Sequence, residues 1–155
     1  MRRRRAEVRD IEPDVRYSNV KIQRFINHVL KDGKKDLAAK LVYDALEIMV
    51  EKTGKEPVEL FEQAMANASP RMEVRPRRIG GATYQIPMEV HTHRAFTLAS
   101  RWILEAARSR KGQPFQERLA DELLSAFNNE GSAIRKREEA HRMAKANRAF
   151  SHFRI

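Results

Sequence analysis

Few side chains in this sequence have the types and spacing that catalysis or metal binding requires. The histidines are His28, His91, His93, His141 and His152. None has the HExxH spacing of a zinc protease or stands near a nucleophile motif. His91 and His93 are two residues apart and could present two imidazoles to a metal ion, but a solvated turn is the favoured interpretation. Glu138 and Glu139 are adjacent, so on a helix they face different directions and make a poor acid–base pair.

Other catalytic chemistries are excluded by what the sequence lacks. It contains no cysteine, which rules out disulfides, thiolate zinc sites and cysteine nucleophiles. Gly80 and Gly81 are not accompanied by the lysine or the spacing of a phosphate-cradling loop. The sequence therefore predicts a protein that is not an enzyme and that holds no metal ion and no cofactor.

Positively charged side chains are the chemistry that the sequence has in excess. The 155 residues include 31 Lys and Arg against 21 Asp and Glu, which gives a net charge of +10. The isoelectric point is about 10.3. A positive field of this size favours phosphate-rich partners. Cations gather at the start of the chain, between residues 71 and 78, and again in residues 131–155.

Residues 1–17 are predicted to be a basic arm without helical periodicity. The run from Arg2 to Arg5 should stay unstructured until it meets an anion. The arm is either a solvated tail or a nucleic-acid-binding arm, and we favour the second interpretation. No apolar run follows the charges, so a secretory signal is not predicted. No later segment is long and apolar enough to span a membrane.

Residues 69–90 are the one stretch whose pattern is not helical. Apolar and polar residues alternate on both sides of Gly80-Gly81, which predicts a β-hairpin arm over residues 71–90. A two-residue loop at these glycines would pair Met72 with Glu89 and so mix the apolar and polar faces. We therefore expect a three- or five-residue loop, or a bulged arm, that pairs Met72 with an apolar residue.

The charged and aromatic residues of this hairpin leave two interpretations open. Arg75, Arg77 and Arg78 either contact phosphates or keep an exposed hairpin soluble. Tyr84 either stacks on a base or packs at the root of the ribbon.

The rest of the chain shows the apolar spacing of amphipathic helices. Ile22, Phe25 and Val29, for example, follow the i, i+3, i+7 spacing of a stripe that faces a core. Three such stripes precede the arm and two follow it, and residues 132–155 are predicted to form a basic helix and tail. The sequence thus predicts an all-α helical domain of about six helices over residues 1–155, with a protruding β-hairpin arm inserted between the third and fourth helices.

Three functions are compatible with this pattern. The first is an RNA-binding protein of an assembled ribonucleoprotein. The second is an architectural DNA-binding protein, usually a dimer, that inserts basic arms into a minor groove. The third is a basic module that contacts acidic proteins alone.

Three segments carry a resemblance to a known family. In the first, Phe25-Ile26 is followed after six residues by Gly33-Lys34-Lys35 and after five more by Leu41-Val42. The second is the arm, PRMEVRPRRIGGATYQIPMEV, and the third is the ending, MAKANRAFSHFRI. Together they resemble ribosomal protein seven of the small subunit, and the resemblance covers essentially the whole chain.

The resemblance implies a cytoplasmic structural constituent of the small ribosomal subunit. Such proteins bind the 3′ major domain of 16S rRNA directly, nucleate assembly of the subunit head, and lie at the subunit interface near the exit-site tRNA and mRNA. They also touch neighbouring head and platform proteins.

The resemblance and the charge pattern together give a set of expected contact residues. The rRNA-facing positions are Arg2, Arg3, Arg4, Arg5, Lys34, Lys35, Arg75, Arg77, Arg78, Arg94, Arg135, Lys136, Arg137 and Arg142. The ribbon-tip positions that could meet tRNA or a platform protein are Arg78, Gly80, Gly81 and Tyr84. Because side chains cannot read the deep major groove of A-form RNA, we expect recognition through phosphates, sugars and shape.

Overall fold

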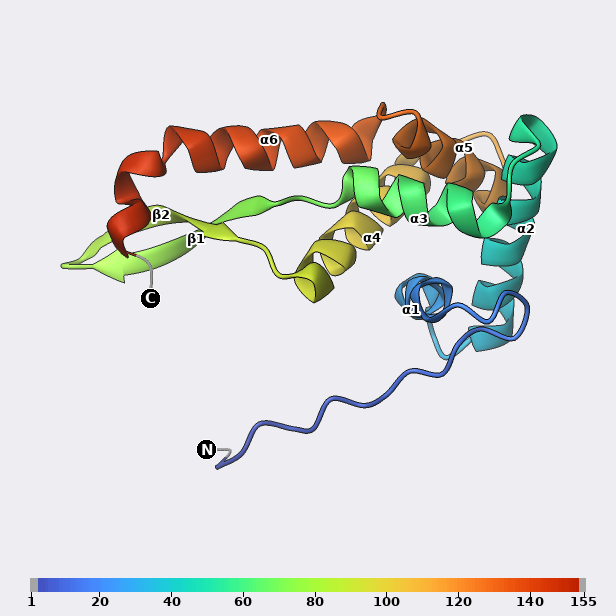
Figure 1. Ribbon diagram of the computed structural model, residues 1–155, viewed down its shortest axis with the longest axis horizontal. Helices are drawn as coiled ribbons and strands as arrows, with labels where there is room; N and C mark the ends of the chain where they lie inside the picture. The colour runs from blue at the N-terminus through green and yellow to red at the C-terminus, as the bar shows by residue number, and fades with distance from the viewer. Residues whose placement is uncertain (1–2, 154–155) are drawn as a thin grey trace.

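Helices make up most of the molecule (Figure 1). The computed structural model describes residues 3–153. Its helices are α1 (Val20–Val29), α2 (Lys35–Thr53), α3 (Pro57–Ala68), α4 (Thr92–Ser109), α5 (Phe115–Phe127), α6 (Ser132–Ala146) and the 3₁₀ helix η1 (Arg148–Phe153). The strands β1 (Met72–Ile79) and β2 (Ala82–Glu89) form an antiparallel ribbon between α3 and α4. The predicted all-α fold with an inserted hairpin is confirmed.

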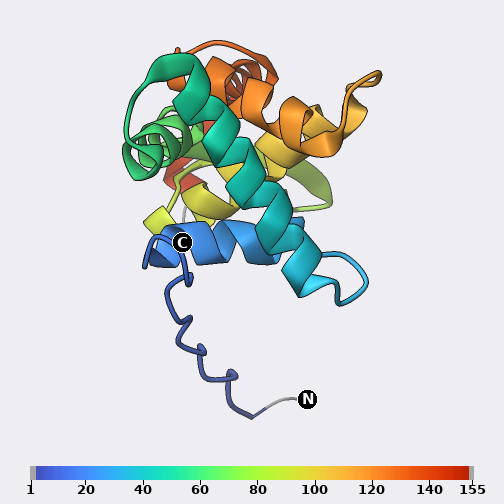
Figure 2. The same cartoon turned by 90° about the vertical axis from the view of Figure 1, so that its right-hand side faces the viewer.

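The core lies where α1 to α5 meet, and α2 crosses the other helices at one end of the molecule (Figure 2). Phe25 of α1 and Phe61 of α3 are fully buried and pack edge to face, with ring centroids 5.4 Å apart. Leu46 of α2 and Leu119 of α5 are buried beside them. Each stripe stabilises the fold by removing apolar surface from water, at about 25 cal/mol per Å². This core is the platform from which the ribbon and the N-terminal arm project.

The ribbon turns at Gly80 and Gly81 alone, so the prediction of a longer loop or a bulge is wrong. The strands pair Met72 with Glu89, in the register that the sequence pattern argued against. Both glycines have positive φ, 57° and 86°, as a tight turn between twisted strands requires. The turn chemistry therefore decided the register.

This register is stable because the ribbon packs on both of its faces. Ile86 and Pro87 are consecutive, so they point to opposite faces, yet both are buried. Pro87 and Met72 line a cavity together with residues of α6 and η1. On the opposite face, Tyr84 packs against η1. The assumption that all apolar side chains share one face was the source of the error.

Helix α6 runs alongside the ribbon, and η1 turns back onto it (Figure 1). The backbone N–H of Arg71, just before β1, donates a hydrogen bond of 2.9 Å to Nε2 of His141. His141 must therefore be neutral and carry its proton on Nδ1. Burial, reinforced by the nearby charges of Arg137 and Arg71, lowers the pKa of His141. This contact fixes the root of the ribbon to α6.

Asp14 fixes the point at which the N-terminal arm leaves the helical core. Its carboxylate is 2% exposed and accepts hydrogen bonds from the backbone N–H groups of Tyr17 and Asn19, each at 2.7 Å. It also accepts one from the Tyr43 hydroxyl at 3.0 Å. Residues 3–10 are exposed and extend on the same side of the molecule as the ribbon (Figure 1).

Candidate nucleic-acid interface

The tip of the ribbon stands clear of the rest of the molecule. A side chain built at Gly80 or Gly81 would meet nothing within 4 Å. Arg78 beside them is exposed, and within residues 3–153 its guanidinium has no hydrogen-bond or ion-pair partner. Because the glycines lack side chains, a partner's backbone can approach the tip closely. The three predicted tip residues are therefore available to a partner.

Arg75 and Arg94 come from different elements and share one carboxylate. Nη2 of Arg75 on β1 lies 2.8 Å from Oε1 of Glu73, and Nη2 of Arg94 on α4 lies 3.5 Å from Oε2 of the same residue. Two guanidinium groups and one carboxylate leave one positive charge in excess. Glu73 thus holds two predicted RNA contacts together without neutralising both.

Arg77 and Tyr84 lie opposite each other on the ribbon and both contact η1. Nη1 of Arg77 donates a hydrogen bond of 2.5 Å to the carbonyl oxygen of Phe153. The Tyr84 ring lies 5.2 Å from that of Phe150 and 5.8 Å from that of Phe153, measured between centroids. The Tyr84 ring therefore packs on η1. Tyr84 is the third residue of β2, so this packing lies in the half of the ribbon nearer the glycine turn and not at the ribbon root.

Arg137 of α6 is occupied inside the protein. Its side chain is 19% exposed. Nη1 donates to the carbonyl oxygen of Asn67, near the end of α3, and to Oδ1 of Asn129 at 3.2 Å. The last carbonyl groups of a helix lack intrahelical partners, so a cation is well placed there. These contacts give Arg137 a packing role between α6 and α3.

The other predicted residues of α6 are more accessible. Arg135 donates to the Ser132 hydroxyl at 2.9 Å, and Lys136 pairs with Glu105 of α4. Arg142 is exposed and, among the residues that the structure describes, has no bonded partner. Exposed ion pairs contribute little to stability, so the Lys136 amine is easily released to a phosphate.

Lys34 and Lys35 stand at the beginning of α2. Lys34 is the N-cap residue, Lys35 is the first helical residue, and both side chains are exposed. The start of a helix has unpaired N–H groups and a partial positive charge. Two lysines at this end add to the positive charge of the helix start and so do not stabilise the helix. Together, the lysines and the unpaired N–H groups form a favourable site for an anion.

Of the predicted arm residues, Arg3, Arg4 and Arg5 are exposed. Arg2 lies outside the described residues. The structure thus brings the ribbon, the start of α4, α6 and η1 together, whereas the α1–α2 turn and the arm are separate basic elements (Figure 1).

A sequence profile for the family described as "Ribosomal protein S7p/S5e" matches residues 1–148. The chain belongs to this family. It is 58% identical over 154 residues to the small ribosomal subunit protein uS7 of Fervidobacterium nodosum, covering 99% of each chain. It is 57% identical to the protein of the same name from Thermotoga petrophila, again over 99% of each chain. With that from Chloroflexus aurantiacus it shares 54% identity over 98% of this chain and 97% of the relative.

Membership of the S7p/S5e family makes this chain a ribosomal protein and not an enzyme, as the sequence predicted. In residues 3–153 there is no cluster of three or more His, Asp or Glu side chains that could hold a metal ion. Among the helices of that same range, none combines the length and apolar content needed to cross a membrane.

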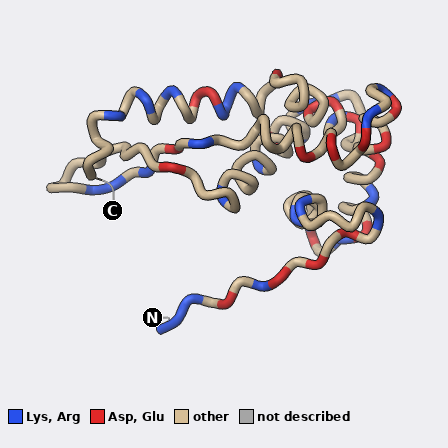
Figure 3. Tube along the Cα trace, in the orientation of Figure 1, with Lys and Arg blue, Asp and Glu red and all other residues tan. Residues whose placement is uncertain are grey.

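Charge is unevenly distributed over this S7p/S5e protein (Figure 3). Residues 35–68, which span α2 and α3, contain seven Asp and Glu against four Lys and Arg. Residues 132–153, which span α6 and η1, contain two against six. Acidic side chains are thus enriched on α2 and α3, and basic ones along α6 and η1.

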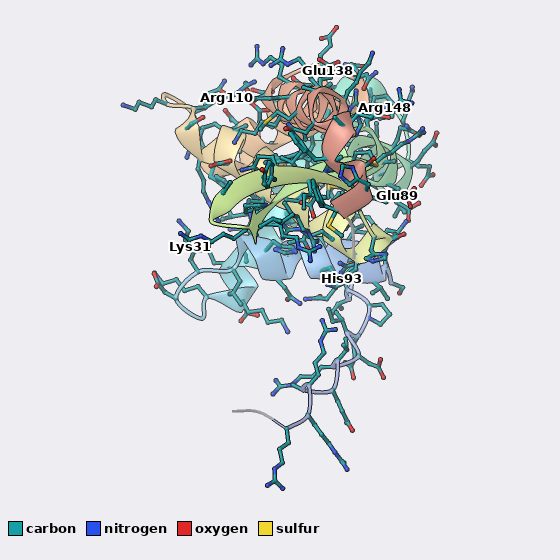
Figure 4. All side chains as sticks on the ribbon, turned by 90° about the vertical axis from the view of Figure 1, so that its left-hand side faces the viewer. Lys31, Glu89, His93, Arg110, Glu138 and Arg148 are labelled. Carbon is teal, nitrogen blue, oxygen red and sulfur yellow. The ribbon has the colours of Figure 1, made fainter. Side chains whose placement is uncertain are left out.

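The sequence analysis predicted Arg94 but missed the rest of a basic surface between α1 and α4. Arg94, Arg101 and Arg108 are seven residues apart, which puts them on one side of α4 at intervals of about two turns. Arg24 of α1 faces this region, where its guanidinium contacts His93. Figure 4 shows His93 at the start of α4. The spacing of the α4 arginines was visible in the sequence, but the approach of α1 was not.

Proposed function

We propose that this chain is a structural constituent of the small ribosomal subunit that binds the 3′ major domain of 16S rRNA directly. Family membership supports the ribosomal role. We further propose that binding nucleates assembly of the subunit head and places the protein at the subunit interface, near the exit-site tRNA and mRNA. Residues 1–155 would act as a single rRNA-binding domain in the cytoplasm, with no cofactor.

The observation that carries the proposal is that exposed cations stand on several separate elements around one buried core. They occur on the arm (Arg3–Arg5), at the start of α2 (Lys34, Lys35), on the ribbon (Arg78) and on α6 (Arg142). Cations fixed this far apart on one scaffold can hold several RNA strands at once. The protein would then stabilise the RNA conformer whose phosphates match this arrangement.

The ribbon tip is proposed to contact tRNA or a neighbouring platform protein, and the body of the protein to contact other head proteins. Gly80 and Gly81 give the tip a narrow profile, and Arg78 gives it a charge. Tyr84 would support this contact indirectly, because its packing on η1 orients the distal part of the ribbon.

Nuclease footprinting on naked small-subunit rRNA, with a large excess of duplex DNA as competitor, tests the proposal. Protection confined to the 3′ major domain is expected. Uniform protection, or binding that the DNA abolishes, would contradict it. If about six to ten phosphates are neutralised, affinity should fall by about three to five decades between about 50 and 200 mM salt, with the duplex-DNA slope as an upper guide.

A pair of charge reversals localises the contact. Arg78→Glu should weaken rRNA binding and reduce the slope of log affinity against log salt by about one. Lys55→Glu is the matched control, because Lys55 lies between α2 and α3, where acidic residues are enriched, and its ammonium packs 4.7 Å from the Phe127 ring centroid. Equal losses from the two variants would mean that binding follows net charge alone.

A further inference from the structure

The turn between α1 and α2 contains an Asp-Gly sequence. Asp32 and Gly33 lie between Val29, where α1 ends, and Lys35, where α2 begins. In the whole sequence no other aspartate, and no asparagine, is followed by glycine. The turn projects at the edge of the molecule (Figure 2), and Lys31 at its start lies at the periphery (Figure 4). Because glycine has no side chain, the backbone nitrogen of Gly33 is the least hindered that can follow an aspartate.

The side chain of Asp32 and the backbone N–H of Gly33 are both free. Asp32 is exposed, and its carboxylate has no hydrogen bond or ion pair within the described part of the chain. Two other hydrogen bonds close the turn, from the N–H of Lys34 to the carbonyl of Lys31 at 3.1 Å and from the N–H of Lys35 to the carbonyl of Gly33 at 3.0 Å. Among the described residues the Gly33 N–H has no acceptor, and a Cβ built at Gly33 would meet nothing within 4 Å. The Gly33 nitrogen is therefore unhindered and unpaired beside a carboxyl group.

The charges around this turn favour attack on the carboxyl group. As a nucleophile attacks, negative charge develops on a carboxyl oxygen, and nearby cations and N–H groups stabilise that charge. Lys34 is the N-cap residue of α2 and Lys35 is its first residue, so the helix start provides both kinds of group. Lys31 adds a third cation on the other side of the turn, whereas the first turn of α2 contains one acid, Asp36.

We propose that Asp32 and Gly33 form a site of spontaneous isomerisation, at which the peptide linkage moves from the α-carboxyl to the β-carboxyl group of Asp32. The Gly33 nitrogen attacks Cγ of the protonated side chain, a C–N bond forms, and the carboxyl OH leaves with the N–H proton as water. A second water molecule then opens the cyclic imide. Opening at the side-chain carbonyl restores aspartate, and opening at the main-chain carbonyl gives isoaspartate. No reagent is consumed, because the water lost on ring closure is regained on ring opening.

Isoaspartate changes the turn in two ways. The main chain gains a methylene group, which shifts Lys34 and Lys35 relative to α1, and the former α-carboxylate becomes a short acidic side chain beside them. This freed carboxylate is the group that isoaspartyl methyltransferases methylate with S-adenosylmethionine, so an enzyme of this class would recognise the product. A further consequence rests on the proposed rRNA-binding function: the isomerised chain should bind rRNA more weakly, and bound rRNA should shield the turn.

The experiment incubates the intact protein at neutral pH and physiological temperature and samples it over weeks. Transfer of a labelled methyl group by an isoaspartyl methyltransferase counts isoaspartate, and fragmentation in a mass spectrometer locates it. Label should accumulate at Asp32. Asp32→Asn should accumulate it faster, because a neutral amide is attacked more readily than a carboxylate and releases ammonia. Asp32→Glu should lose the label at this position, because its ring closure requires a larger ring.

Asp10→Glu is the matched control. Asp10 is exposed as well, but the branched side chain of Ile11 shields the nitrogen that follows it, so this variant should accumulate label as the natural protein does. Circular dichroism checks that every variant is folded. The inference is overturned if the natural protein gains no label at Asp32, if it gains label only after denaturation in urea, or if Asp32→Glu is labelled equally at this position.

Addition of rRNA separates this inference from the proposed function. A saturating transcript of the 3′ major domain should slow the labelling of Asp32. Labelling at an unchanged rate would overturn the predicted rRNA contact at Lys34 and Lys35, whereas isomerisation of the free protein would stand. The proposed function itself fails if the natural protein does not prefer the transcript to duplex DNA, whatever happens at Asp32.

Discussion

The helical core and the projecting elements of this molecule are held together by different kinds of contact. In the core, large side chains such as Phe25, Phe61 and Leu46 are completely buried. Along the ribbon, α6 and η1, burial is mostly partial. There, a histidine that accepts a backbone N–H, an arginine that donates to a carbonyl and a small group of aromatic rings hold the elements in place.

This difference in burial suggests that the core provides the stability of the fold and that the projecting elements provide the surface for recognition. Apolar burial in the core supplies most of the free energy of folding, since it is the dominant favourable term. The projecting elements bury little, so their surfaces can carry cations that would be costly in a core. Substitutions in the core should therefore lower stability, and substitutions on the projecting elements should weaken binding. Three expected outcomes test this difference.

The largest effect is expected in the core. Phe25→Ala should lower the free energy of unfolding by about 3 to 5 kcal/mol, because it removes a fully buried ring and leaves a cavity against Phe61. Leu37→Ala is the control. Its side chain is 50% exposed, and the cost should be about 0.5 kcal/mol. Urea denaturation followed by circular dichroism measures both, and similar costs would contradict the assignment of stability to the core.

The junction between the two regions comes next. Arg137→Gln should lower the free energy of unfolding by about 1 to 3 kcal/mol, because the carbonyl of Asn67 and the Asn129 side chain lose a charged donor. Arg142→Gln is the matched control on α6. It should leave stability nearly unchanged and weaken rRNA binding instead. Paired unfolding and binding measurements distinguish the roles, and an exchange of the two results would show that Arg137 is the RNA contact.

The helices could be predicted from sequence because their signal is local. Ile22, Phe25 and Val29 repeat with the period of a helix, and the partner of that stripe need not be known for the helix to be predicted. The same holds for the position of the hairpin, since Gly80-Gly81 between alternating segments marks a turn. In both cases the decisive interactions lie within a few residues of one another.

Features that depend on distant parts of the chain could not be predicted. The burial of apolar side chains on both faces of the ribbon depends on elements that follow it in the chain, because Met72 and Pro87 line a cavity with residues of α6 and η1, and Tyr84 packs on η1. The hydrogen bond from Arg137 to the carbonyl of Asn67 joins residues that are 70 positions apart, so the sequence pattern did not reveal it. The pairing of Arg24 with His93 spans 69 residues. Composition indicated that the surface is basic, but tertiary packing decides which cations remain free.

The smallest effect concerns the contact that fixes the ribbon root to α6. Because the fold lowers the pKa of His141, its contribution to stability is complete above about pH 6.5, the ordinary value, and declines as pH falls below it. In His141→Gln the amide oxygen can still accept the Arg71 N–H but cannot be protonated. The natural protein should therefore lose more stability than this variant between about pH 7.5 and 5.5. Hydrogen exchange at the Arg71 amide, corrected for its intrinsic pH dependence, measures this effect. Protection should decline with falling pH in the natural protein and stay constant in the variant. The same decline in both proteins would mean that another group loosens the ribbon root.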